Sequence, residues 1–252
     1  MNNIAASNCR IDEIADGIFR ISKPVPPADF PGGFTYNQFL ILDEKPMLVH
    51  TGMNRIFPEV TEAIARVIPV ERLRYVAFSH NEADECGALN AFLELAPDAV
   101  PVCGSIGART AISDFSLRPP IGLKHGESIS LGRHTVRWLD APHVPHGWDC
   151  GYLFEELTAT LFCGDLFTQS GEEHEPVVES DILASSEVLR KRVNYYSMSP
   201  DTKMLIARLA DCKPGLLACM HGSAWRGNGS RLLMQLADAL VPAQAPSEAR
   251  LS

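Results

Sequence analysis

Four strand-like runs follow one another between residues 127 and 164, and this stretch constrains the fold more than any other. The runs are ESISLG, HTVRWLDAP, GYLFEEL and ATLFCGD, separated by glycine, proline and acidic turns. Helical spacing of apolar residues predicts helices on both sides of the stretch, at 55–68, 84–96 and 108–115 before it and at 185–196, 200–210 and 229–240 after it. Strand-rich and helix-containing segments therefore occur twice each.

Shorter strand patterns complete the sheets. IDEIADGIFRISK predicts a strand pair around Gly17, and NQFLILDEKPMLVHTG predicts a hairpin. RYVAFS, AVPVCGS and GLLACM predict buried strands between the helices. The pattern predicts an α+β fold, an αββα sandwich of two mixed sheets packed face to face with helices outside. We expect one domain over residues 1–240 and a disordered tail over 241–252.

Composition excludes several classes of function. The net charge of −9 argues against nucleic acid and anionic membranes as partners. The first residues predict no secretory signal, and no apolar run approaches the roughly 20 residues that span a bilayer. Seven scattered cysteines without a CxxC motif are typical of a reduced cytoplasmic protein.

Polar side chains of metal-ligand type follow the ends of four predicted strands. His80 follows YVAFS, His146 follows VRWLDAPHVP, Asp165 ends ATLFCG and His221 follows GLLACM. Residues at the ends of neighbouring strands meet at one rim of a sheet structure, where sites are commonly built. With the carboxylates in HNEADE, the expected cluster is His80, Glu82, Asp84, Glu85, His146, Asp165 and His221.

This mixture of imidazoles and carboxylates predicts a site for two first-row metal ions. One carboxylate can bridge two ions, and alternation in His-x-Glu-x-Asp lets one loop supply both. The competing interpretation is a solvated helix start, because acidic residues at positions 84 and 85 suit a helix dipole. The further ligand-type residues at strand ends favour the metal site.

The motifs resemble the metallo-β-lactamase fold and, more narrowly, the diiron domain of the flavodiiron and oxygen-binding diiron proteins. Hydrolases of that fold carry HxHxDH, whereas this chain has Glu82 at the second histidine position, as the flavodiiron variant does. YNQFLI, RVNYYSMSP and MHGSAWRG also resemble segments of that family. Together the similar segments span about residues 30–235.

The resemblance implies a first iron held by His80, Glu82 and His146, and a second by Asp84, His221 and the residue at position 85. Asp165 would bridge them, and Tyr195 or Tyr196 would hydrogen-bond a bound diatomic molecule. It further implies two iron ions, with zinc or manganese as alternative occupants, O₂ or NO as ligand, and a homodimer. Because no flavodoxin domain follows, we expect no bound flavin and a separate electron-donor protein.

The sequence departs from the family pattern at two positions. Glu85 stands where histidine is usual, so it either ligates the second ion or leaves a position open. His50 stands where aspartate is usual, and we expect it to hydrogen-bond a ligand rather than to be one. His143 competes with His146 as a ligand, and the spacing to Asp165 favours His146.

Two other functions stay open at this point. A metal-dependent hydrolase of the same fold would act on an ester, lactone, thioester or phosphodiester, and a degenerate scaffold would bind no metal. Glu82 and the tyrosine pair argue against the hydrolase. We expect His174, His125 and His134 to lie at the surface and not to bind metal.

Overall fold

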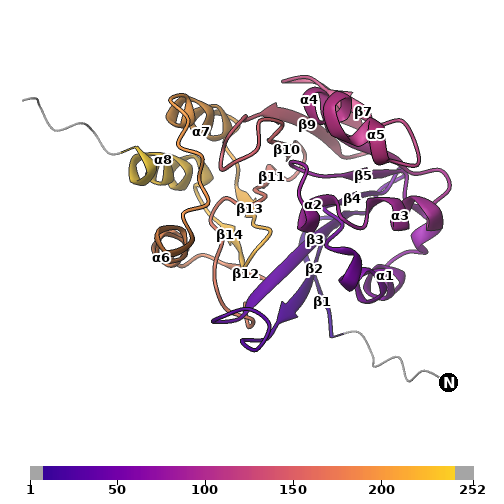
Figure 1. Ribbon diagram of the computed structural model, residues 1–252, viewed down its shortest axis with the longest axis horizontal. Coiled ribbons are helices and arrows are strands. Elements are labelled where there is room, and N and C mark those ends of the chain that lie inside the picture. Colours follow the sequence, from indigo (N-terminus) through magenta and orange to yellow (C-terminus); the bar gives the residue numbers. More distant parts are fainter. Residues whose placement is uncertain (1–7, 242–252) are drawn as a thin grey trace, which may run out of the picture.

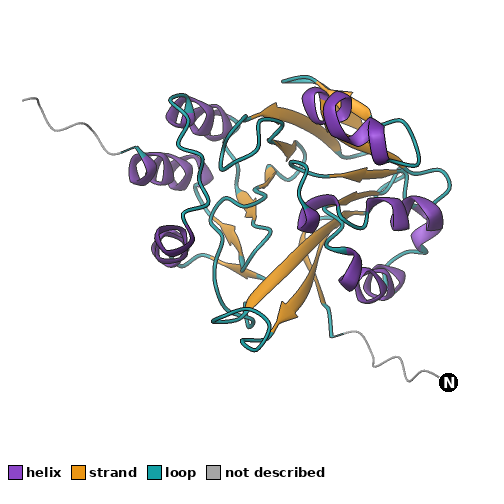
Figure 2. Ribbon diagram, in the orientation of Figure 1, coloured by secondary structure: helices purple, strands orange, loops and turns teal. Residues whose placement is uncertain are grey.

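Two seven-stranded mixed sheets pack face to face with helices on their outer faces in a computed structural model, which describes residues 8–241 (Figures 1 and 2). This is the expected αββα sandwich. The first sheet has the order β1 (Arg10–Ala15), β2 (Ile18–Val25), β3 (Phe34–Ile41), β4 (Met47–Val49), β5 (Tyr75–Ala77), β6 (Val100–Gly104), β7 (Ile121–Leu123). The second has the order β12 (Val177–Val178), β14 (Ala224–Arg226), β13 (Leu216–Ala218), β11 (Thr160–Phe162), β10 (Gly151–Glu155), β9 (Thr135–Asp140), β8 (Ser128–Ser130).

The direction of the strands follows from their connections. β1 to β4 pair antiparallel, with short turns between β1 and β2 and between β3 and β4 and a longer loop over residues 26–33 between β2 and β3. β4 to β7 pair parallel because helical segments connect them. In the second sheet β8 to β11 are antiparallel, and β13 pairs parallel with β11. The ends of β11 and β13 therefore lie side by side at one edge of the molecule.

The core between the sheets is built around Trp138, which is fully buried. Its indole ring lies against two glycines, one from each sheet. A Cβ atom at Gly104 would lie 2.8 Å from the ring, and one at Gly151 would lie 2.3 Å from it. Both positions thus exclude a side chain because the tryptophan takes the space.

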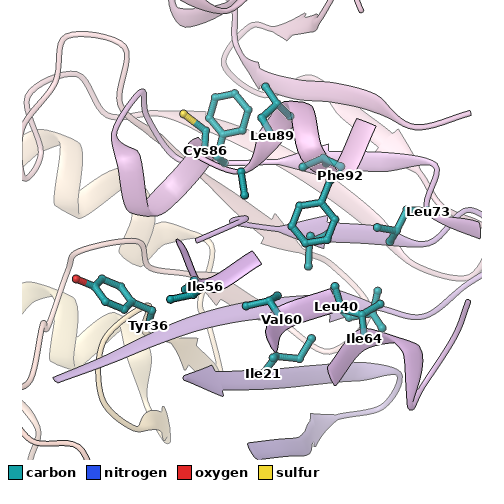
Figure 3. Close-up of a cluster of buried hydrophobic side chains, with 14 of the residues drawn as sticks. Ile21, Tyr36, Leu40, Ile56, Val60, Ile64, Leu73, Cys86, Leu89 and Phe92 are labelled. Carbon is teal, nitrogen blue, oxygen red and sulfur yellow. The ribbon is translucent and has the colours of Figure 1, made fainter. Parts of the chain in front are cut away.

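Two further apolar clusters join the helices to the outer faces of the sheets. The helices are α1 (Phe57–Ala65), α2 (Ala83–Cys86), α3 (Leu89–Leu95), α4 (Ser105–Gly107), α5 (Ser113–Phe115), α6 (Leu183–Val193), α7 (Thr202–Asp211) and α8 (Gly229–Leu240). In Figure 3, Ile21 and Leu40 from the first sheet contact Val60 and Ile64 of α1, with Phe92 of α3 in the same cluster. The second cluster joins α6, α7 and α8 to β10, β11 and β13.

The helix expected over 84–96 is interrupted. The Ala88 amide donates to Gly52 O at 3.0 Å and to Thr51 Oγ1 at 3.1 Å instead of continuing a helical ladder. Packing against the loop after β4 therefore divides the segment into α2 and α3.

The helix expected over 185–196 also ends earlier, so the prediction that the tyrosine pair is helical is wrong. α6 stops at Val193, and Asn194 has a left-handed backbone with φ of 55°. The following residues bond to the loop between β9 and β10, where Ser197 N donates to Pro145 O at 2.7 Å. The short strands β7, β12 and β14 were not predicted.

Apart from Val241, the expected tail lies outside the described residues. Among residues 8–241, helices that combine the length and apolarity needed to cross a bilayer are absent.

Candidate metal centre

The predicted ligands meet where strands of both sheets end. His80 lies three residues beyond β5, and His146 lies in the loop from β9 to β10. Asp165 lies three residues after the end of β11, and His221 lies three residues after the end of β13. Because these two strands are adjacent and parallel, the two side chains come together. The Asp149 carboxylate accepts a hydrogen bond from Asn81 N at 3.0 Å and so joins the loops of His80 and His146.

A first group of donor atoms comes from His80, Glu82, His146 and Asp165. The two Nε2 atoms of His80 and His146 lie 3.0 Å apart, and Glu82 Oε2 lies 3.0 and 2.8 Å from them. Asp165 Oδ2 lies 3.3 Å from His146 Nε2 and 3.6 Å from His80 Nε2. Four donor atoms from three loops therefore face one point.

A second group comprises Asp84, Asp165 and His221, and a third comprises Glu82, Asp84 and Glu85. Nε2 of His221 lies 3.1 Å from Asp165 Oδ1 and 3.6 Å from Asp84 Oδ2. Asp165 thus turns one oxygen to each side of the cluster. Glu85 is fully buried, and its Oε1 lies 3.9 Å from His80 Nε2.

In each of the three imidazoles, a protein group lies within hydrogen-bond distance of Nδ1, the ring nitrogen that does not belong to the donor groups. His146 Nδ1 donates to Tyr195 O at 2.9 Å, and His221 Nδ1 donates to Thr35 O at 2.8 Å. His80 Nδ1 lies 3.0 Å from Ser79 Oγ. Such bonds fix ring orientation and tautomer, leaving Nε2 free to bind an ion, as in many metal sites.

His50 lies behind this arrangement and is absent from the donor groups, but it contacts Ser79 rather than one of the predicted ligands. Its Nε2 lies 3.2 Å from Ser79 Oγ, so it reaches His80 through that hydroxyl. Complete burial lowers the pKa of His50 from 6.5 to about 3, although Asp165 acts in the opposite direction. His50 is therefore a neutral partner of the serine at neutral pH.

The carboxylates and imidazoles of the cluster lie so close together that they shift one another's pKa values. Hydrogen bonds from His146 and then His80 lower the pKa of Glu82 to about 2. Burial, and then the nearby Asp165, raise the pKa of Glu85 well above its ordinary value. Burial opposes charge on His80, but Glu85 and other neighbours raise its pKa well above 6.5.

The donor set fits two divalent ions. Four carboxylates carry up to four negative charges, which two such ions would balance. Both carboxylate oxygens of Glu85 are buried without a hydrogen-bond partner, as expected for oxygens that receive an ion. The mixture of imidazole and carboxylate donors suits first-row metals.

The remaining histidines lie outside these groups, counted over residues 8–241. His143 is exposed, whereas His146 lies in the first group. His125 is exposed and His174 is half-buried. The prediction for His134 is wrong, because this residue is 1% exposed and its Nδ1 lies 3.0 Å from Glu155 Oε1. The turn before β9 folds against the glycine turn between β1 and β2, which covers the ring.

A cavity of about 260 Å³ opens onto the donor atoms. Its lining combines donor residues with a mostly apolar wall of Phe30, Phe34, Tyr36, Met53, Leu189, Val193 and Tyr195. Phe34 stacks on the ring of His221 with centroids 4.3 Å apart, and Phe30 stacks on Phe34 at 4.5 Å. The sequence predicted only a loop for PVPPADFPGGF, although two phenylalanines in a proline- and glycine-rich loop are a signal for a binding wall.

The two tyrosines of the pair have different surroundings. Tyr195 lines the cavity, and its hydroxyl donates to Asp165 O at 3.2 Å. Tyr196 is buried in the apolar cluster beneath α6 to α8 and is not part of the cavity lining. A larger cavity of about 720 Å³ lies beside α8 and contains none of the donor residues.

Comparison with known proteins gives one family match and a consistent set of relatives. A family model described as "ODP family beta lactamase" matches residues 34–222. Nitric oxide reductase of Moorella thermoacetica is 27% identical over 213 residues, which cover 80% of this chain and 52% of that protein. Rubredoxin-oxygen oxidoreductase of Megalodesulfovibrio gigas is 30% identical over 208 residues, covering 78% and 50%. This chain therefore spans about half the length of these relatives.

Solved structures agree on the fold. Rubredoxin oxygen:oxidoreductase from Desulfovibrio gigas matches 91% of this chain and 62% of its own with a TM-score of 0.79 at 23% identity. The flavodiiron protein from Giardia intestinalis matches 92% of this chain and 59% of its own, with a TM-score of 0.77 at 17% identity.

Proposed function

We propose, from the premise that this chain belongs to the ODP family of β-lactamase-fold proteins, that its donor cluster binds two iron ions and that the protein binds or reduces O₂ or NO. The observation that carries the proposal is the orientation of Asp165. Its Oδ2 faces the imidazoles of His80 and His146, and its Oδ1 faces His221. One carboxylate is thus placed to serve two neighbouring ions.

The remaining ligands divide between the two ions. His80, Glu82 and His146 would hold the first, and Asp84 and His221 the second, with Asp165 shared. Two ferrous ions, when bound, would supply electrons to a small ligand at one place and avoid release of a radical. Zinc or manganese could occupy the same donors after heterologous expression, since many first-row ions compete for such sites.

The cavity wall would select the ligand. Aromatic and aliphatic side chains make most of the wall, so water and charged molecules lose hydrogen bonds on entering, whereas a small uncharged molecule does not. Tyr195 is the only hydroxyphenyl side chain of the predicted pair on this wall, and we assign the hydrogen bond to the bound ligand to it. Its hydroxyl would make this bond in place of the one that it donates to Asp165 O.

Electrons would come from a separate donor protein. The relatives named rubredoxin-oxygen oxidoreductase and flavorubredoxin suggest a rubredoxin-like protein or a flavoprotein in this role. We also propose that the protein is a cytoplasmic homodimer. The exposed apolar residues Val188 and Val193 of α6 support the homodimer, and Val193 also lines the cavity. Assembly on this face would cover them.

The test uses protein reconstituted with iron, reduced without oxygen, and mixed with NO or O₂ in the presence of reduced rubredoxin. We expect a change in the visible spectrum and consumption of the gas. If the iron form responds to neither gas and the zinc form hydrolyses esters, lactones or phosphodiesters, a metallo-hydrolase replaces this proposal.

A further inference from the structure

We propose that Arg20, Thr35 and Asn37 are positioning residues for His221 and that they set the affinity of the second ion without contacting it. All three are buried and belong to β2 and β3 of the first sheet, whereas His221 follows β13 of the second sheet. None of the three lines the cavity over the donor atoms. The inference rests on the proposed function, because its effect is measured on one of the two proposed ions.

The turn that carries His221 is bonded to β3 at both ends. In a four-residue turn, the carbonyl group of the first residue often accepts a hydrogen bond from the amide of the fourth. Here Cys219 O accepts from Asn37 Nδ2 at 2.9 Å, and Gly222 N donates to Thr35 Oγ1 at 2.7 Å. The position of the histidine between these two residues therefore depends on side chains of the other sheet.

The carbonyl group that follows His221 accepts from two of these side chains. Gly222 O lies 2.9 Å from Arg20 Nη2 and 2.8 Å from Asn37 Nδ2. Because the side-chain amide nitrogen of Asn37 faces two carbonyl oxygens, only a group with two hydrogens to donate satisfies both. A hydrophobic side chain of similar size at position 37 would leave both oxygens without this donor.

The imidazole ring of His221 is held by the same strand. Its Nδ1 donates to Thr35 O at 2.8 Å, and Phe34 stacks on the ring with centroids 4.3 Å apart. The opposite nitrogen, Nε2, lies 3.1 Å from Asp165 Oδ1. Backbone and side chain of the proposed ligand are thus both oriented from β3, so a change in this support should alter how Nε2 meets an ion.

Arg20 adds a buried charge to the support. Its side chain is 1% exposed, and burial lowers the pKa of the guanidinium to about 10, so it stays charged at neutral pH. Asp12 Oδ2 is 3.9 Å from Nη1, which exceeds hydrogen-bond length. The bond from Nη2 to Gly222 O is therefore charge-assisted, and such bonds are stronger than those between neutral groups.

The experiment titrates metal-free full-length protein with Zn²⁺ by calorimetry and counts the bound ions. His221→Gln first identifies the binding step that belongs to the second ion. Asn37→Leu should weaken that step by about 10- to 100-fold and change the other step by less than about threefold. Gln38→Leu is the matched control, because this neighbouring amide is equally buried but its polar atoms have no hydrogen-bond partner among residues 8–241. It should match the wild type.

Two pairs of variants separate positioning from loss of packing. Thr35→Val keeps the shape but removes the acceptor for Gly222 N, whereas Thr35→Ser keeps that acceptor. Arg20→Met removes the guanidinium, whereas Arg20→Lys keeps a charged donor. We expect the valine and methionine variants to weaken the second ion by at least about tenfold and the serine and lysine variants to restore most of the affinity.

Each outcome has a separate meaning. Wild-type affinity for both ions in Asn37→Leu and Thr35→Val would overturn this inference and leave the proposed function standing. Equal weakening of both ions, without recovery in Thr35→Ser, would show an effect on the fold as a whole and would also overturn it. A wild type that binds no ion would overturn both proposals. Thermal unfolding of each metal-free variant verifies the fold, and the Thr35 pair decides the question if Asn37→Leu does not fold.

Discussion

Asp165 Oδ1 lies 3.1 Å from Nε2 of His221, and the two residues follow adjacent parallel strands at the same distance from the strand ends. The other oxygen of the same carboxylate lies on the side of His146 and His80. This geometry joins the two donor groups through one side chain, so changes at Asp165 should affect both ions.

Asp165→Ala should therefore reduce the metal content from two ions to less than one per chain. The substitution removes a donor from both groups and leaves each with fewer than the roughly four ligands that such ions take. Elemental analysis of purified protein measures the change. Asp114→Ala, an exposed aspartate on α5, should keep the wild-type content. Equal metal content in Asp165→Ala and the wild type would exclude the ligand assignment.

Ser79→Ala should weaken binding of the first ion by about 10- to 100-fold. Ser79 Oγ connects His80 Nδ1 with His50 Nε2, and its loss frees the orientation of the ligand ring. A competition titration with a coloured chelator measures the affinity. Ser130→Ala, at an exposed position of β8, serves as the matched variant. Identical affinities for both variants would mean that the hydroxyl does not support the ligand.

His50 should make metal-free protein less stable as the pH falls. The unfolded histidine binds its proton near 6.5, whereas folded His50 does so only at about 3. Between these values the unfolded state holds the extra proton, so the free energy of unfolding decreases on acidification by up to about 1.4 kcal/mol per pH unit. His50→Asn should lack this component in urea unfolding at several pH values. The exposed His125→Asn should follow the wild type, and parallel curves for all three proteins would refute the prediction.

Tyr195→Phe should weaken NO binding to the iron-loaded protein roughly two- to tenfold without changing the metal content. One hydrogen bond has a net value of about 0.5–1.5 kcal/mol. Spectroscopic titration with NO measures the affinity. Tyr75→Phe, at the start of β5 and away from the cavity, is the control. No difference between the two variants would remove Tyr195 from the ligand site.

Gly151→Ala should destabilise the fold by about 1–3 kcal/mol, because its Cβ atom would lie 2.3 Å from Trp138 and the core cannot accommodate it. Gly215→Ala has open space around the new methyl group and should be tolerated. Thermal unfolding compares the two. An unchanged melting temperature for Gly151→Ala would show that the tryptophan can move aside.

Much of this architecture follows from the sequence, because strand and helix periodicities are local. The expected strand pair around Gly17 and the hairpin ending at β4 both occur. Strand ends also predict which residues converge, and His146 rather than the exposed His143 reaches the cluster. The sequence also predicts a site for two ions, because residues of metal-ligand type alternate within the loop that holds His80, Glu82 and Asp84.

The features that could not be predicted from the sequence depend on contacts between residues that are far apart in the chain. The break between α2 and α3 arises because Thr51 and Gly52 accept from Ala88, and no local signal marks that bond. His134 is covered by a turn from the other sheet and paired with Glu155, which its neighbours in sequence do not indicate. Phe30 and Phe34 form part of the cavity wall because β3 places Phe34 against the ring of His221, and Phe30 of the preceding loop stacks on Phe34.

The most direct test of the proposed diiron centre is the metal content of protein purified without oxygen, with a visible spectrum before and after exposure to air. The proposal predicts about two iron ions per chain and a near-ultraviolet band that appears on oxygenation. Zinc alone, with no spectral response to O₂ or NO after reconstitution with iron, would contradict it.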